Sequence, residues 1–432
     1  MSKFQIIIII IFAIVGISAV LIFAGILPGF KKQGSGGEGM EVSMWGVFPE
    51  KKIGSLISGF NEKNKNYFKI NYSEKKASDY ENELLNALAS GQGPDIWVLT
   101  QDAILKNKNK IYPISLDSYK ERDFRDNFLD SAELFLDSRN KNIIGLPLAV
   151  DPIVLYWNRG LFSSAGIAQP PQYWDEFLTD VQALTKRDDA GNIIQTGAAL
   201  GEFTNVKNAK DILSLLMLQT DNSIVNKDTL EVVLGKKGSN VLDPTESSLR
   251  FFLEFSNPSK SSYSWNKALP DSEIMFVSGS LAMYFGYGSK IDDIKQKNPH
   301  LNFDIAVVPQ IRDGKIKATF GKIYGLVISK NSPQIQTALP AIATLSANDF
   351  SKSFSEATGL GSASREVLAA GANDPVLSVI YKSSVMSRAW LEPNPERVYE
   401  IFKNMVESAA TGRVKISEAV SQAKRQLEKL LK

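Results

Sequence analysis

The side chains with distinctive chemistry in this chain are aromatic and acidic, and the usual catalytic residues are scarce. The absence of cysteine excludes disulfides, thiol catalysis, cysteine-ligated zinc and iron–sulfur clusters. The single histidine, His300, follows Pro299 and precedes an extended run, a pattern typical of a surface turn. A Ser-His-Asp triad or a histidine metal site would have to use this one residue. We therefore predict no catalytic residue, no metal and no cofactor.

The aromatic residues favour carbohydrate recognition, because flat rings stack on the C–H faces of sugars and present a polar edge beside them. The chain has six tryptophans. Trp45 stands at the end of a strand-like run before Gly46, and it either lines a pocket or packs on its rim. Trp97 and Trp157 lie within apolar runs and are expected in the core. For Trp265, both interpretations stay open.

Two carboxylates, Asp102 and Asp151, are the pair that a glycosidase would need. Glycoside hydrolysis requires two carboxyl groups about 5–10 Å apart across the sugar bond. Nothing in the sequence brings these two into that geometry, so we predict binding without chemistry. Each also has a purely structural interpretation, Asp102 as a helix cap and Asp151 as a hydrogen-bonding group at a joint between lobes.

Hydrophobic spacing after residue 40 predicts strand, helix, strand, helix and strand at 40–45, 51–64, 67–72, 79–90 and 95–99. Short connections between such elements predict a parallel sheet with helices on both faces. In these sheets ligands collect beyond the carboxyl ends of the strands, where the loops after the first and third strands lie. These loops supply the first candidate binding residues: Trp45, Gly46, Phe48, Gln101 and Asp102.

Further along the chain, two extended runs at 143–150 and 153–157 flank Asp151-Pro152, and the proline forces Asp151 into extended geometry. Such a joint suits a chain that passes from one lobe to another. Strands are also predicted at 303–308 and 320–329. Helices are predicted at 174–186, 208–219, 242–256, 338–345, 349–356, 374–385, 395–411 and 417–431. Thr204 and Asn205 precede the 208–219 helix, whose amino terminus offers N–H groups to a ligand.

The amino-terminal segment Ile6–Leu27 carries no charge and is long enough to cross about 30 Å of hydrocarbon as a helix. A cleaved signal peptide has a shorter apolar core of roughly 7–15 residues, and no small-residue cleavage site follows. We therefore predict an uncleaved membrane anchor over 1–30. The Gly/Ser-rich residues 31–40 predict a flexible tether. No strand precedes these glycines, so they do not indicate a dinucleotide-binding loop.

Length and charge limit the remaining function classes. A chain of 432 residues exceeds one ordinary core, so two or more domains are expected. The net charge is +2. Lys3, Lys31 and Lys32 against Glu38 account for all of it, which leaves the body neutral. A neutral body argues against binding of nucleic acid, which needs clustered lysine and arginine.

Several short motifs, in order along the chain, carry a family resemblance. They are Gly91-Gln-Gly-Pro-Asp-Ile96, Leu155-Tyr-Trp-Asn158 with Leu161-Phe162 and Ala165-Gly166, Gly279-Ser-Leu-Ala-Met283, and Ile305-Ala-Val-Val-Pro309. Over residues 41–432 the chain resembles the extracellular solute-binding proteins of ABC importers, family 1, which includes maltose-binding protein. No single motif is specific, but their shared order makes chance agreement improbable.

The resemblance implies an α/β fold of the periplasmic-binding-protein-like type II, with two lobes joined by a hinge. It places 41–150 and 309–345 in lobe 1, and 151–308 and 346–432 in lobe 2. It further implies that a sugar or oligosaccharide is captured in the interlobe cleft and delivered to ABC permease subunits. The body would be monomeric and would lie at the extracytoplasmic face of the membrane.

The resemblance also implies binding roles for particular residues. Asp102 and Asp151 fall where maltose-binding protein has carboxylates that contact sugar, and Trp390 falls near its aromatic platform. Gly286 and Tyr287 occupy the loop where that protein has two tryptophans. The complete set of expected ligand-binding residues is Trp45, Gly46, Phe48, Gln101, Asp102, Asp151, Thr204, Asn205, Gly286, Tyr287, Tyr324 and Trp390.

Three alternatives stay open at this point. The same fold could bind a non-sugar solute such as a glycerophosphodiester, a polyamine or a peptide, with Lys290 and Arg388 available to an anionic ligand. The chain could instead serve a sensor kinase or an adhesion system as its binding module. The third alternative is a membrane-anchored hydrolase.

Overall fold

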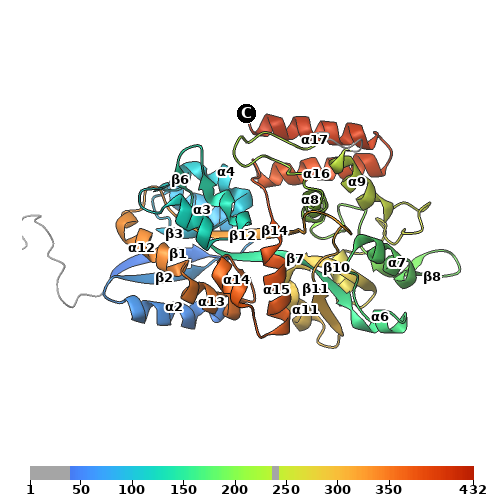
Figure 1. Ribbon diagram of the computed structural model, residues 1–432, viewed down its shortest axis with the longest axis horizontal. Helices are drawn as coiled ribbons and strands as arrows, with labels where there is room; N and C mark the ends of the chain where they lie inside the picture. Colours follow the sequence, from blue (N-terminus) through green and yellow to red (C-terminus); the bar gives the residue numbers. More distant parts are fainter. Residues whose placement is uncertain (1–38, 236–242) are drawn as a thin grey trace, which may run out of the picture.

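The computed structural model describes residues 39–235 and 243–432 (Figure 1). Within them an 11-stranded sheet has the order β2-β1-β3-β12-β7-β10-β9-β8, with β11, β13 and β14 paired beside this path. A separate sheet has the order β4-β6-β5. The strands are β1 (Met40–Gly46), β2 (Phe68–Glu74), β3 (Ile96–Thr100), β4 (Ile114–Ser115), β5 (Leu136–Asp137), β6 (Asn142–Ile143), β7 (Leu146–Asn158), β8 (Lys186–Arg187), β9 (Ile193–Ala198), β10 (Leu281–Tyr287), β11 (Phe303–Ala306), β12 (Thr319–Ile328), β13 (Gly361–Ser362) and β14 (Ser387–Arg388).

Helices cover this sheet along its length (Figure 1). They are α2 (Glu50–Asn64), α3 (Tyr80–Ala89), α4 (Ile104–Asn107), α5 (Glu121–Asn127), α6 (Arg159–Ser164), α7 (Trp174–Leu184), α8 (Ala209–Gln219), α9 (Pro244–Glu254), α10 (Ser272–Val277), α11 (Ile291–Lys297), α12 (Ile335–Leu345), α13 (Asn348–Thr358), α14 (Arg365–Ala370), α15 (Pro375–Val385), α16 (Pro395–Ala410) and α17 (Ile416–Leu430). Short 3₁₀ turns join some of them, among them η1 (Gln101–Ala103), which follows β3 directly.

The predicted parallel sheet at the start of the body is confirmed. β1 pairs in parallel with both β2 and β3, and α2 and α3 connect them. The helix α2 buries Ile53, Ile57 and Phe60, which lie on one face at helical spacing. The loops after β1 and β3 therefore leave the sheet at the same edge, as the sequence predicts.

One continuous strand, β7, replaces the two predicted runs around Asp151-Pro152. All of β7 is buried, and Pro152 does not interrupt it because the proline keeps Asp151 in the extended conformation that a strand requires. Residues 146–152 of β7 pair with β12, and residues 153–158 pair with β10 and β11. β7 therefore belongs to both halves of the large sheet and connects the strands on the β12 side with those on the β10 side (Figure 1).

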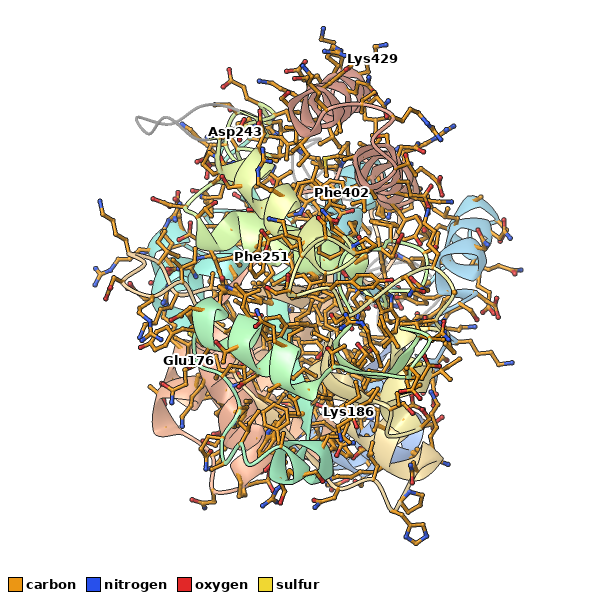
Figure 2. The ribbon with its side chains drawn as sticks, turned by 90° about the vertical axis from the view of Figure 1, so that its right-hand side faces the viewer. Glu176, Lys186, Asp243, Phe251, Phe402 and Lys429 are labelled. Carbon is orange, nitrogen blue, oxygen red and sulfur yellow. The ribbon has the colours of Figure 1, made fainter. Side chains whose placement is uncertain are left out.

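The carboxyl-terminal helices lie over the part of the molecule that contains α8 and α9. α16 packs against α8, α9 and α17, and α17 packs against α9. Figure 2 shows Phe402 of α16 directed toward the interior and Lys429 on the outer side of α17. Phe402 is fully buried and Lys429 is exposed, which is the distribution that the amphipathic pattern of each helix predicts.

The structure adds elements that the sequence did not indicate. The helices α10 and α14 are each six residues long, too short for a periodic pattern to stand out. The expected membrane anchor at 1–30 and most of the 31–40 tether lie outside the described residues. Among the helices of 39–235 and 243–432, none combines the length and hydropathy needed to cross a membrane.

Candidate ligand-binding site

A buried charged cluster forms where α8 meets the loop that leads into α16. Lys210 and Asp211 lie in the first turn of α8, and Glu392 lies in the loop between β14 and α16. The Lys210 Nζ atom donates a hydrogen bond to Glu392 Oε1 and lies 3.3 Å from Asp211 Oδ1. Glu392 is fully buried, so this ion pair is shielded from water.

Tyr287 connects this cluster to the central sheet. Its hydroxyl, at the end of β10, donates a 2.7 Å hydrogen bond to Asp211 Oδ2. Lys322 of β12 places its Nζ atom 5.1 Å from the centroid of the Tyr287 ring, which is within cation–π range. Three elements, α8, β10 and β12, therefore converge on the same place.

Asp102 approaches the cluster from η1, and its carboxylate attracts the ammonium group of Lys210. Among the described residues, its buried Oδ1 atom has no hydrogen-bond partner, and neither has Glu392 Oε2 or Gln101 Nε2. The other side of the Gln101 amide is engaged, because Oε1 accepts a 2.7 Å hydrogen bond from the Ile323 N–H. Buried polar atoms without partners are rare, so these three atoms are candidate contacts for a bound solute.

Asp151 lies in the middle of β7, opposite Lys322 of β12. It is 3% exposed, and its Oδ1 atom accepts a 3.0 Å hydrogen bond from the Ser289 N–H. Burial raises the pKa of Asp151 to about 6, although the Ser289 hydrogen bond and the ammonium groups of Lys322 and Lys290 oppose that shift. The hydrogen bond and the two lysines therefore offset only part of the cost of burying a negative charge on Asp151.

Electrostatic coupling within the cluster is strong. Burial works against the charge of Lys210, but the carboxylates of Asp211, Glu392 and Asp102 hold its pKa above the usual range. Burial raises the pKa of Glu392 to about 8; the Lys210 ammonium opposes this shift, and the Asp102 and Asp211 carboxylates add to it. The cluster thus holds carboxyl groups whose charge is costly without a further partner.

Aromatic rings from the middle of β12 and from the loop after β1 lie near Asp102 and Asp151. Phe48 packs edge-on against Tyr324, with ring centroids 5.3 Å apart. Tyr324 and Lys322 line a cavity of about 220 Å³ together with Tyr80, Trp97 and Thr100. Rings next to hydrogen-bonding groups are the combination that binds a solute with both apolar faces and hydroxyl groups.

Other predicted site residues have structural contacts of their own. Gly46 and Gly286 are buried, and a Cβ atom on Gly286 would lie 2.5 Å from the Tyr284 ring. Trp390 is 1% exposed, stacks on Phe402 and donates from Nε1 to Ser214 Oγ at 3.3 Å. The Trp45 ring is half-buried and lies under the Lys75 ammonium, 3.8 Å from the ring centroid.

The residues Thr204 and Asn205 have contacts away from the charged cluster. Thr204 is exposed. Asn205 accepts a 3.0 Å hydrogen bond from Trp265 Nε1 and donates to the Asn266 and Leu269 carbonyl groups. Asn205 therefore holds the 265–269 loop in place. Trp265, for which the sequence left a binding role and a core role open, is fully buried in that loop.

Sequence reasoning missed four charged residues of the site: Lys210, Asp211, Lys322 and Glu392. Two signals were available, because Lys210 and Asp211 occupy the helix start that was expected to face a ligand, and Glu392 follows Trp390 by two residues. No such signal was available for Lys322, because its position opposite Asp151 depends on which strands pair in the folded protein. In the described ranges no group of three or more His, Asp or Glu residues has the geometry to hold a metal ion.

Comparison with known proteins places these features in a family. A family model described as "Bacterial extracellular solute-binding protein" matches residues 43–349. A Streptococcus pneumoniae (strain R6) "Maltooligosaccharide ABC transporter solute-binding lipoprotein" is 22% identical over 353 residues, 77% of this chain and 75% of that protein. A Brucella abortus (strain 2308) protein described as a binding protein is 22% identical over 284 residues. That match spans only 64% of the Brucella protein's length.

Solved structures show the same fold at low sequence identity. A cyclic alpha-maltosyl-1,6-maltose binding protein from Arthrobacter globiformis superposes with a TM-score of 0.75 at 17% identity, covering 91% of this chain and 99% of that chain. A cyclo/maltodextrin-binding protein complexed with maltotetraose gives a TM-score of 0.71 at 18% identity, covering 92% and 98%. At these identities the likeness concerns the fold alone.

Proposed function

Because the chain belongs to the bacterial extracellular solute-binding protein family, we propose that it captures a sugar or oligosaccharide and delivers it to an ABC permease. The family match covers well over half of the chain. The prediction of a binding protein without catalytic activity is confirmed by this membership, since the family consists of receptors for solutes. The predicted α/β periplasmic-binding-protein-like fold is likewise confirmed by the structural matches.

We further propose that the solute lies between two lobes joined by a hinge. The expected lobes were 41–150 with 309–345, and 151–308 with 346–432. The packing of α13 against α2, and of α14 against α5, favours assigning residues 346–370 to the first lobe. The second lobe would then consist of 151–308 and the chain from α15 onward, and Asp151 would lie at the boundary on β7.

The observation that carries the sugar proposal is the set of buried hydrogen-bonding atoms without partners beside aromatic rings. Asp102 Oδ1 can accept a hydrogen bond from a hydroxyl group, Glu392 Oε2 can donate one while the carboxyl group is protonated and accept one when it is ionised, and Gln101 Nε2 can donate one. Tyr324, which follows the residue whose N–H binds Gln101, supplies an aromatic ring nearby. The names of the relatives, which refer to maltooligosaccharides and maltodextrins, support the same class of solute.

Thermal unfolding of the full-length protein with a panel of oligosaccharides, amino acids and phosphodiesters tests this proposal. A ligand present at 100 times its Kd adds about 2.7 kcal/mol to the free energy of unfolding. We expect a rise in Tm with one class of oligosaccharide. A rise with amino acids or phosphodiesters alone would overturn the sugar proposal and leave the family assignment intact.

We also propose that the amino-terminal segment 1–30 anchors the body at the extracytoplasmic face of the membrane. The family is extracellular, and the pneumococcal relative is a lipoprotein. This chain has no cysteine to carry a lipid, so a helix would have to provide the anchor. Membrane fractionation of cells expressing the full-length protein and a 39–432 truncation tests this: only the full-length form should remain with the membrane.

A further inference from the structure

The cavity of about 220 Å³ adjoins the candidate site at the carboxyl end of β3. Its walls come from β3, α3, η1, α4 and β12. They include Thr100, the last residue of β3, together with Lys322 and Tyr324 of β12. Gln101 and Asp102, which carry buried atoms without hydrogen-bond partners, follow Thr100 directly. A solute held by these residues therefore lies next to the cavity.

One hydrogen-bond donor in the wall of this cavity has no partner. Trp97 lines the cavity and is 1% exposed, and its buried Nε1 atom has no hydrogen-bond partner among the described residues. Two other fully buried tryptophans differ, because Trp265 Nε1 donates to Asn205 Oδ1 at 3.0 Å and Trp390 Nε1 donates to Ser214 Oγ at 3.3 Å. An indole N–H can only donate, and it usually finds a partner when it is buried. A solute group that enters the cavity therefore gains affinity by presenting an acceptor to Trp97.

Aliphatic and aromatic side chains make up much of the remaining wall. Val47 follows β1, Leu84 belongs to α3 and Leu99 belongs to β3. The rings of Tyr80 and Tyr324 extend this apolar surface. The Tyr80 hydroxyl is already engaged, because it donates a 2.9 Å hydrogen bond to a carbonyl oxygen of β3. A small apolar group is therefore stabilised in the cavity by burial.

The two charged residues of the cavity wall, Glu81 and Lys322, have partners within the protein. Glu81 Oε1 lies 2.6 Å from Lys106 Nζ. Lys322 lies opposite Asp151 in the pairing of β12 with β7, and its Nζ atom lies 5.1 Å from the centroid of the Tyr287 ring. A further charge in the cavity would be buried without a counter-charge, which is costly. The group that fits the cavity is therefore uncharged.

We propose that this cavity receives an acetamido group of the solute, so that the substrate class is an N-acetylated amino sugar. The carbonyl oxygen of that group accepts the Trp97 N–H, its methyl group packs on the aliphatic wall, and the Thr100 hydroxyl can accept its amide N–H. A hydroxyl group supplies an acceptor but leaves the aliphatic wall uncovered, and an amine brings an unpaired charge. The inference rests on the proposed function, because it names the class of sugar that the protein captures.

Calorimetric titration of the full-length protein with oligosaccharides that differ only in one substituent tests the inference. The set contains oligomers of N-acetylglucosamine, glucosamine and glucose of equal length, in both the α-linked and the β-linked series, at a pH where the amine is protonated. We expect the N-acetylated oligomer to bind on the order of 10-fold more tightly than the glucose oligomer, because a methyl group is buried and Trp97 gains an acceptor. The glucosamine oligomer should bind more weakly than either.

Two variants locate the effect in the cavity. Trp97→Phe removes the indole N–H and keeps an aromatic ring, and Ala77→Leu adds bulk at an exposed loop residue that lines the cavity. Each should remove most of the preference for the N-acetylated oligomer and leave the affinity for the glucose oligomer unchanged. If Trp97→Phe fails to fold, as its Tm without ligand would reveal, Ala77→Leu still tests the proposal because Ala77 is exposed.

Each variant has a matched control outside the cavity. Trp174→Phe removes an indole N–H that donates to Gln219 of α8 at 2.6 Å. Ala190→Leu adds the same bulk at an exposed residue between β8 and β9. Both controls should retain the preference for the N-acetylated oligomer.

The outcomes separate this inference from the sugar proposal. A preference for the N-acetylated oligomer that is lost in the two cavity variants supports both. Equal affinity for the N-acetylated and glucose oligomers, tighter binding of the glucosamine oligomer, or a preference that survives both cavity variants overturns the acetamido inference and supports the sugar proposal. Binding only of other sugars in the thermal unfolding panel has the same meaning. No binding of any sugar in either experiment overturns both.

Discussion

Tyr287 joins the end of β10 to the first turn of α8 through one hydrogen bond. Its hydroxyl donates to Asp211 Oδ2 at 2.7 Å, and the residue is 8% exposed. This bond fixes one oxygen of Asp211, while Lys210 engages the other. Tyr287 therefore orients the acidic side chain that faces Lys210, whether or not it also contacts the solute.

Tyr287→Phe should lower the free energy of unfolding by about 1–3 kcal/mol, because a buried carboxylate oxygen loses its donor. Urea denaturation followed by circular dichroism measures the change. Tyr399→Phe is the matched control, because Tyr399 is 44% exposed and its ring contact with Phe203 survives the substitution. Equal stability of the two variants would show that the Tyr287 hydroxyl contributes nothing.

At the scale of elements, Gly286 of β10, which was predicted to bind the solute, has a packing role. Gly286 lies between the rings of Tyr284 and Tyr156, which would be 2.5 Å and 3.0 Å from an added Cβ atom. Gly59 of α2 differs, because nothing lies within 4 Å of its Cβ position. The two glycines therefore form a natural comparison.

Gly286→Ala should lower the free energy of unfolding by about 1–3 kcal/mol through overpacking of β10. Gly59→Ala should raise it by roughly 0.5–1 kcal/mol, since alanine is favoured over glycine within a helix. Differential scanning calorimetry measures both. A Gly286→Ala protein as stable as the parent would mean that the tyrosine rings move aside without cost.

Exposed ion pairs connect elements that the proposed lobes would separate. Lys52 of α2 lies 2.6 Å from Asp292 of α11, and Lys106 of α4 lies 2.8 Å from Glu396 at the start of α16. Each pair would form only when the lobes are closed. Such pairs, partly screened by solvent, contribute on the order of 0.2–1 kcal/mol.

Lys106→Ala should therefore weaken solute binding by no more than about fivefold, the equivalent of roughly 1 kcal/mol. Its effect should shrink at high salt, because salt screens exposed charges. Titrations at low and high salt measure this, with Lys429→Ala on the outer face of α17 as the control. An equal loss of affinity at both salt concentrations would contradict an electrostatic contact between lobes.

At the scale of the whole molecule, the raised pKa of Glu392 links stability to pH. Its pKa of about 8 lies above the ordinary value of 4.5, so the folded protein binds a proton that the unfolded chain releases between these values. Stability from this group is therefore greatest at the acidic end and falls as pH rises from about 4.5 to 8. The charged groups acting on it are Lys210, Asp102 and Asp211.

Chemical denaturation from pH 5 to pH 8 should therefore show a steeper loss of stability in the parent than in Glu392→Gln, which has no proton to lose. Taking the difference between the two proteins removes the contributions of other groups, such as Asp151 and Asp180, whose pKa values burial raises to about 6. Parallel curves for the parent and the variant would mean that Glu392 ionises in the folded protein as it does in the unfolded chain.

Much of the architecture follows from local pattern. The strands at β1, β2 and β3 and the helices α2, α8, α16 and α17 appear within a few residues of the predicted bounds. Periodic burial and capping residues are properties of neighbouring positions, so a single sequence contains them. The motif order identified the family, which the comparison with known proteins confirmed.

The composition of the candidate site was decided by tertiary structure. The sequence determined that Asp102 would follow the end of a strand, because chain direction places it there, and the family resemblance indicated Tyr287. Only folding brought Lys210, Lys322 and Glu392 beside them, from α8, β12 and the loop before α16. Charge compensation depends on distances between side chains far apart in sequence, and those distances arise only when the elements pack.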